Sequence, residues 1–185
     1  SLACQLGNEL IAEALLTLGA NPNPLQIDLQ VMPPLMVAIT HNHSSLVPLL
    51  LHWNADPNGA FGNDTPLTLA VRKNDLLLIQ TLIEYGADVN EATPNGHTPL
   101  SIASDHGYLS VVESLVTVGA DVNHENLPLS LACTSSDRQH SSVAKYLIEH
   151  GAELERSLKM GRTPLHIMAL IGNVEKAKEL IDNGQ

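Results

Sequence analysis

Basic residues and cysteines are scarce in this sequence of 185 residues. Only 9 Lys and Arg stand against 20 Asp and Glu, which argues against binding along a nucleic-acid backbone, since such binding needs clustered positive charge. The two cysteines, Cys4 and Cys133, are too few for a disulfide framework, so we expect intracellular residence, in the cytoplasm or the nucleus. No apolar run approaches the ~18 residues of a membrane-spanning helix, and we expect no membrane partner.

The negative charge is distributed unevenly along the chain. Residues 1–137 contain 14 acidic and 2 basic residues, whereas residues 138–185 contain 6 acidic and 7 basic residues. The whole chain has a net charge of −11. Because opposite charges steer association, we expect the acidic part of the chain to meet a partner that carries a basic segment.

A repeat of about 33 residues runs through the sequence. Gly-Ala or Asn-Ala dipeptides begin at positions 19, 54, 86, 119 and 151, and Gly184 follows in phase. Prolines at positions 34, 66, 99, 128 and 164 form a second series with nearly the same spacing. A period of this length indicates a stack of similar units rather than a single globular domain.

Each unit contains the pattern of two short helices. Thr65 suits the N-cap of the first helix and Pro66 its first position, because proline lacks the N–H that would be unpaired there. Leu78 and Leu82 lie on one apolar stripe of the second helix, and Gly86 suits the left-handed residue that ends it. Helices this short are unstable alone, so each pair is expected to bury its apolar side against the next pair.

The motifs at these positions resemble those of the ankyrin-repeat family. Thr65-Pro66-Leu67, Thr98-Pro99-Leu100 and Thr163-Pro164-Leu165-His166 are similar to the family's helix-opening motif. Residues 85–90 and 118–123 are similar to its closing motif, Gly-Ala-Asp-Val-Asn. The resemblance implies an all-α solenoid of helix-turn-helix units with hairpin or loop fingertips. It implies about six repeats, the first and last incomplete, at 1–24, 25–59, 60–92, 93–123, 124–156 and 157–185.

The same resemblance implies a scaffold that binds a partner protein or peptide through its concave face of fingertips and first helices. The alternative left open is an internal spacer or intramolecular docking module of a larger enzyme, such as a kinase, ubiquitin ligase or channel. Because position 1 falls inside an expected helix, we expect the array to be a fragment of a longer multidomain protein. No nucleophile, phosphate-loop or zinc motif accompanies the repeats, so no enzymatic activity, cofactor or metal is predicted.

Position by position, the resemblance assigns a set of partner-binding residues to the concave face. Phe61 is the only Phe in the chain and stands at an expected fingertip, where packing does not demand an aromatic residue. Interface hot spots favour aromatic residues and Arg, so Phe61 and Arg72 are the leading candidates. The alternative is that Phe61 packs on the neighbouring fingertip. The predicted set is Leu29, Met32, His41, Phe61, Asp64, Arg72, Lys73, Asn95, His97, Asp105, His106, Met160 and Arg162.

Three further predictions concern polar residues. The resemblance makes Asn90 and Asn123 candidate substrates of a cytosolic asparagine hydroxylase, the alternative being a structural hydrogen bond within the hairpin. Residues 134–142 are predicted to form a polar loop between two helices, because Ser, Thr and Asp favour turns. His166 resembles the family's structural histidine, and the other eight histidines are predicted to be mostly solvated surface residues.

Overall fold

The chain forms two compact units, Ser1–Asn95 and Gly96–Gln185. In the described part of the chain the regular structure is helical, and one isolated bridge joins Phe61 to Asp64. This confirms the predicted all-α class. None of the helices in that part is long and apolar enough to cross a membrane. The structure, a computed structural model, describes residues 2–23, 31–125, 128–135, 137–153, 167–169, 171–172 and 178.

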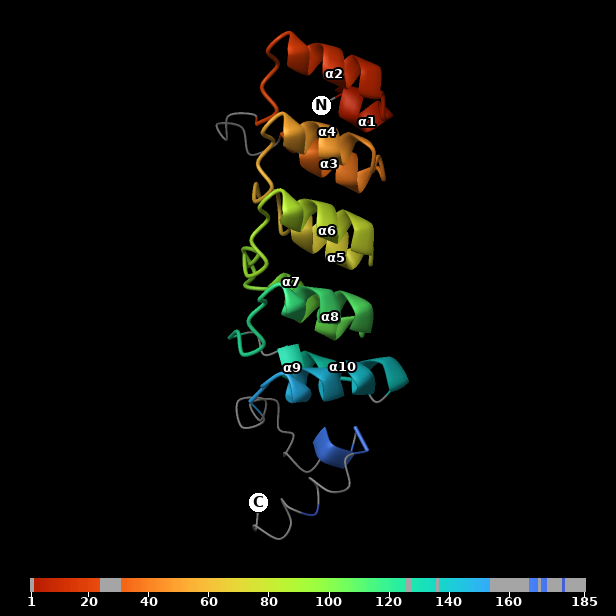
Figure 1. Ribbon diagram of the computed structural model, residues 1–185, viewed down its shortest axis with the longest axis vertical. Coiled ribbons are helices and arrows are strands. Elements are labelled where there is room, and N and C mark those ends of the chain that lie inside the picture. Colours follow the sequence, from red (N-terminus) through yellow and green to blue (C-terminus); the bar gives the residue numbers. More distant parts are fainter. Residues whose placement is uncertain are drawn as a thin grey trace. The chain divides into compact units, whose positions relative to one another are not determined.

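The first unit consists of three successive helix pairs (Figure 1). Within it α1 packs on α3, α3 on α5, and α2 on α4, so neighbouring pairs cover one another's apolar sides. This is the stacking that the repeat period predicts. The pairs are α1 (Leu2–Leu6) with α2 (Glu9–Thr17), α3 (Pro34–Thr40) with α4 (Leu46–His52), and α5 (Pro66–Arg72) with α6 (Leu76–Glu84).

The second unit repeats the arrangement with two described pairs. Here α7 packs on α8 and α9, while α10 packs on α7, α8 and α9. The first pair is α7 (Pro99–Asp105) with α8 (Leu109–Thr117), and the second is α9 (Pro128–Ala132) with α10 (Arg138–Glu149).

Threonine caps begin helices α5 and α7. The hydroxyl of Thr65 accepts the N–H of Thr68 at 3.2 Å, and the hydroxyl of Thr68 accepts the N–H of Thr65 at 2.8 Å. This reciprocal capping box pairs two donors that a helix start leaves unpaired. At α7 the hydroxyl of Thr98 accepts the N–H of Ser101 at 3.2 Å. Helix α3 follows Pro33 and has no side-chain cap.

A small residue occupies the same position in each first helix, where neighbouring helix pairs meet. Ala38, Ala70, Ala103 and Ala132 are all fully buried. A larger side chain at such a site would overpack the contact. Alanine therefore sets how closely the first helices can approach within each unit.

The predicted polar loop at residues 134–142 is wrong for most of its length. Helix α10 begins at Arg138, and Asp137 caps it by accepting the N–H of His140 at 2.9 Å. The hydroxyls of Ser141 and Ser142 donate to the carbonyls of Asp137 and Arg138 at 2.8 and 2.9 Å, inside the helix. The extra residues of this repeat therefore lengthen the second helix, which has 12 residues where α6 and α8 have 9.

Candidate protein-interaction surface

A tight hairpin places Phe61 at a fingertip, as predicted. The N–H of Phe61 donates to the carbonyl of Asp64 at 3.0 Å, and the N–H of Asp64 donates back at 3.3 Å. Gly62 takes the left-handed conformation, with φ of 63°, that the turn between them requires. Phe61 is half-buried, so part of its side chain is accessible to a partner.

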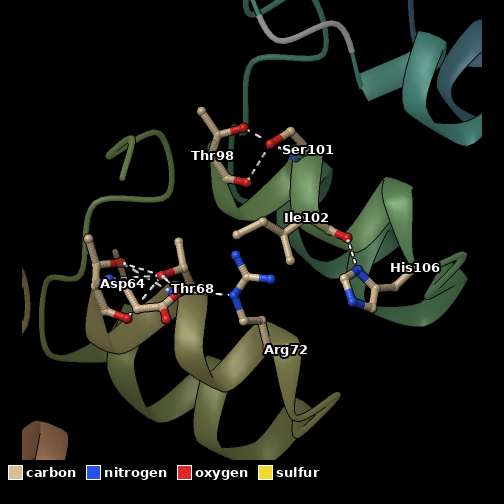
Figure 2. A network of polar contacts seen from close by, with 8 residues as sticks. Asp64, Thr68, Arg72, Thr98, Ser101, Ile102 and His106 are labelled. Carbon is tan, nitrogen blue, oxygen red and sulfur yellow. Dashed lines mark hydrogen bonds and ion pairs between the residues drawn. The ribbon is translucent and has the colours of Figure 1, made fainter. Parts of the chain in front are cut away.

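An ion pair joins this fingertip to the far end of α5. The Nε of Arg72 lies 2.9 Å from Oδ1 of Asp64, with side-chain exposures of 40% and 26% (Figure 2). Asp64 Oδ1 also accepts from the hydroxyl of Thr68 at 3.3 Å. Arg72 ends the helix that Asp64 precedes, so its side chain runs along the exposed side of α5 and braces the hairpin.

The preceding repeat has a contact between the same two positions. Met32 precedes α3 as Asp64 precedes α5, and Thr40 ends α3 as Arg72 ends α5. The hydroxyl of Thr40 lies 3.8 Å from the sulfur of Met32 and donates to the carbonyl of Met36 at 2.7 Å. Two neighbouring repeats therefore cover the exposed sides of their first helices in the same way, one with a hydroxyl–sulfur contact and one with an ion pair.

Polar side chains from the inter-helix turns complete this side of the first unit. Nδ1 of His41 lies 2.9 Å from the carbonyl of Val37, where it can donate to the end of α3. Lys73 donates to Oδ1 of Asn42 at 2.6 Å and to the carbonyl of Thr40 at 3.4 Å. We define the first-helix face of the first unit as Met32, Thr40, His41, Phe61, Asp64, Arg72 and Lys73.

The remaining predicted residues fall elsewhere in the chain. Asn95 is exposed at the end of the first unit, and His97, Asp105 and His106 are exposed in the second. Nδ1 of His106 lies 2.9 Å from the carbonyl of Ile102, which repeats the capping contact that His41 makes in the first unit (Figure 2). Leu29, Met160 and Arg162 lie outside the described residues.

Most of the described aspartates make hydrogen bonds within caps and turns rather than gathering on the first-helix face. Asp75 and Asp137 are N-caps of second helices. Three more carboxylates each accept the N–H two residues later, in the turns after the second helices: Asp56, Asp88 and Asp121. In the first unit the face defined above carries the Asp64–Arg72 pair and the cation of Lys73. The acidity of the chain is therefore not concentrated on this face.

Asparagines hold successive fingertips together within each unit. The amide of Asn58 donates to the carbonyl of Gly86 at 3.2 Å and accepts the N–H of Asp88 at 2.8 Å. Asn123 bonds in the same way to the carbonyl of Gly151 at 2.9 Å and the N–H of Glu153 at 2.8 Å. These side-chain bonds give Asn123 a structural role between successive fingertips rather than within one hairpin. Hydroxylation of Asn90 or Asn123 stays a prediction.

Most of the described histidines lie at the surface, as predicted, and several of them also make hydrogen bonds that the sequence did not predict. His41, His106 and His150 each place Nδ1 2.8–2.9 Å from a carbonyl one helical turn earlier. His43 and His140 reach carbonyls of the preceding helix pair. An Asp three residues before a His, as in Asp137 and His140, is the signal in the sequence that could have identified one of these contacts.

Comparison with known proteins agrees with the repeats described above. Residues 35–126 match the family profile of ankyrin repeats in three copies, and residues 160–185 match that of a single ankyrin repeat. The chain belongs to the ankyrin-repeat family. Arrays of this family are generally protein–protein interaction modules and non-enzymatic scaffolds.

Curated relatives and a solved structure are similar to parts or all of this ankyrin-repeat chain. It is 35% identical over 108 residues to an ankyrin repeat protein of fowlpox virus, covering 51% of this chain and 24% of the relative. It is 35% identical over 97 residues to human ankyrin repeat and SOCS box protein 6, covering 51% and 23%. The chain thus spans about a quarter of the length of these relatives.

The likeness in structure extends over nearly the whole chain. An ankyrin repeat domain from Acinetobacter baumannii matches it with a TM-score of 0.80, covering 99% of this chain and 96% of that domain at 23% sequence identity. This likeness shows the fold.

Proposed function

We propose that this ankyrin-repeat array binds a partner protein or peptide through its concave face, with Phe61 as the main apolar contact. The supporting observation is the first-helix face of the first unit. Two neighbouring repeats hold side chains in place along their first helices, and a half-buried aromatic ring stands beside them at a braced hairpin. Such a surface loses little conformational entropy on binding because its side chains are already fixed.

The face combines apolar and polar side chains. Phe61 and Met32 supply apolar area, while His41, Asp64 and Lys73 supply polar groups. Arg72 has two roles in this proposal, because it contacts the partner and also holds the fingertip through Asp64. We extend the surface to Leu29, Asn95, His97, Asp105, His106, Met160 and Arg162.

A partner with a basic segment fits the charge of the chain. The net charge of −11 attracts positive charge over distances comparable to the Debye length, and this raises the association rate more than the final affinity. The Lys73 cation on the face itself favours a partner of mixed charge over a uniformly basic one. An intramolecular partner elsewhere in a longer polypeptide would use the same contacts.

The test is a binding measurement on three variants. A partner is identified by proximity labelling in cells and purified, and its Kd is then measured by calorimetry. Phe61→Ala is expected to raise the Kd about 10-fold or more, as truncation of an aromatic hot spot does. Arg72→Ala should also raise the Kd, because it removes a contact with the partner and the ion pair that holds the fingertip. The association rate of the unaltered chain should fall as ionic strength rises.

Leu77→Ala is the matched control for this experiment. Leu77 lies on the second helix α6, and its side chain is 73% exposed, so the substitution removes apolar surface away from the first-helix face. Its Kd should equal that of the unaltered chain. The proposal would be contradicted if Phe61→Ala left the Kd unchanged, or if Leu77→Ala raised the Kd as much as Phe61→Ala.

A further inference from the structure

One kind of contact recurs between successive helix pairs inside each unit. A carbonyl in the last turn of the first helix accepts a hydrogen bond from a side chain of the next pair. Gln5 accepts from Nε2 of His43 at 3.1 Å, and Thr40 accepts from Lys73 at 3.4 Å. In the second unit the carbonyl of Asp105 lies 2.9 Å from Nε2 of His140. These side chains pair carbonyls that a helix end leaves unpaired.

In these turns, a residue after the first helix accommodates the side chain that donates from the next pair. Gly7 and Gly107 have φ of 69° and 70°, and both lie against the histidine ring of the next pair. A Cβ at Gly7 would lie 2.5 Å from Nδ1 of His43, and a Cβ at Gly107 would lie 3.0 Å from Nδ1 of His140. The equivalent residue in the second pair is Asn42, whose side chain instead accepts from Lys73 at 2.6 Å. Glycine in the turn therefore accompanies a histidine donor, and asparagine accompanies a lysine donor.

His140 differs from His43 because both of its ring nitrogens face acceptors. Nε2 faces the carbonyl of Asp105 at 2.9 Å, and Nδ1 lies 2.8 Å from Oδ2 of Asp137. A carbonyl and a carboxylate only accept, so the ring satisfies both only when each nitrogen carries a proton. The His43 bond goes through Nε2, which a neutral ring can donate. The geometry at His140 therefore selects the imidazolium.

The charged groups around His140 also favour the imidazolium form. Burial of the ring, which is 13% exposed, by itself lowers the pKa of His140, but the carbonyl of Asp105 and the carboxylates of Asp137 and Asp105 outweigh it. The pKa of His140 is therefore raised above its ordinary value of 6.5. The imidazolium also lies at the carboxyl end of α7, where a helix favours positive charge. Arg138 is the neighbouring cation on α10, and His106 and Tyr108 flank Gly107 in the turn.

We propose that His140 makes the docking of the α9–α10 pair onto α7 dependent on pH. As an imidazolium it links the carboxylate of Asp137 to the carbonyl that ends α7, and loss of one proton breaks one of these two bonds. The proposal concerns the second unit alone and does not rest on the proposed partner-binding function.

The direction of the effect follows from the two pKa shifts. Because the pKa of His140 is raised on folding, its contribution to stability is fully present below pH 6.5 and is lost as pH rises through the folded pKa. The N–H and ring of His140 and the hydroxyl of Ser135 hold the pKa of Asp137 well below its usual range. Its contribution is present above its ordinary value of 3.8 and is lost as pH falls further. Both contributions are thus fully present between the ordinary pKa values of the two groups, 3.8 and 6.5.

The first experiment reads the protonation of the ring directly in the 185-residue chain. Nitrogen chemical shifts of the histidine rings, recorded on 15N-labelled protein, distinguish the imidazolium from either neutral tautomer. At pH 6 both nitrogens of His140 should carry protons, and the ring should titrate with a midpoint above 6.5. A neutral His140 at pH 6 would overturn the proposal, whatever the behaviour of any variant.

The second experiment measures docking by hydrogen exchange. Protection factors of amides in α10, corrected for intrinsic rates, should fall about 3- to 10-fold between pH 6 and pH 8 in the unaltered chain. His140→Gln keeps one donor and cannot titrate, so its protection should not change with pH. His43→Gln is the matched control in the first unit and should retain the fall in α10. The same fall in His140→Gln as in the unaltered chain would contradict the proposal.

Discussion

The same residue type at the same repeat position has different surroundings in successive helix pairs. Leu15, Leu50 and Leu82 are equivalent leucines of the second helices α2, α4 and α6. Leu15 is 46% exposed, whereas Leu50 and Leu82 are 1% and 0% exposed. Leu50 lines a small apolar pocket with Ala12 and Leu16 of the first pair, so it lies where one pair covers the next.

These leucines give a matched test of stability. Leu82→Ala should lower the free energy of unfolding by about 2–5 kcal/mol, since it removes a fully buried side chain and leaves a cavity. Leu15→Ala should cost about 1 kcal/mol or less, because the leucine is already half in water. Urea unfolding monitored by circular dichroism gives both values. Equal losses in the two variants would show that the pairs do not stack as described.

At the residue scale the sequence predicted apolar and glycine positions better than polar ones. Phe61 at the fingertip and Gly86 in the left-handed conformation, with φ of 89°, follow from repeat position alone. The Asp64–Arg72 pair and the two acceptors of His140 do not, because each depends on how side chains extend from separate parts of the chain. The period fixes where the backbone lies but not which polar atoms meet.

At the element scale the helix starts depend on single hydroxyl groups. Thr98 is buried, and its oxygen accepts the N–H of Ser101 at the start of α7. Thr98→Ala should lower the free energy of unfolding by about 1 kcal/mol, because the N–H then loses its partner inside the protein. Thr98→Ser keeps the hydroxyl and should recover most of the loss in the same denaturation assay. A similar loss for both variants would indicate packing of the methyl group instead.

The length of α10 shows what sequence patterns miss at this scale. Ser, Thr and His have modest helix propensity, so the stretch that contains Ser141 and Ser142 was predicted to be a loop. In the structure Asp137 caps the helix, and the two hydroxyls donate to carbonyls one turn earlier. Packing of Val143, Ala144 and Leu147, which are fully buried, favours the helix over the local preference. Tertiary contacts decide the boundary here.

At the scale of the whole molecule the repeat period predicted the class of fold and the pairing of helices. Each helix pair buries its apolar side against the next pair, so the same apolar positions recur in every repeat along the chain. The binding surface is less predictable. Side chains on exposed faces are not required for stacking, so the repeat pattern leaves their identity open.

The first helix pair carries several large apolar side chains that are strongly exposed. Leu2, Leu6, Leu10 and Leu18 of the α1–α2 region are 67%, 68%, 80% and 85% exposed. Several large apolar side chains gathered on one helix pair form a surface that tends to associate, and a repeat array needs polar terminal faces to stay soluble. We therefore expect this 185-residue chain to self-associate as its concentration rises.

Sedimentation velocity over a range of concentrations tests this expectation. The sedimentation coefficient should increase with concentration for the unaltered chain. It should increase much less for the double variant Leu10→Lys/Leu18→Lys, because lysine ammonium groups are costly to bury in such a contact. Leu77→Lys is the control, since Leu77 is 73% exposed but lies alone on α6. If Leu77→Lys suppressed association as strongly as the double variant, association would depend on net charge rather than on the apolar surface of the first pair.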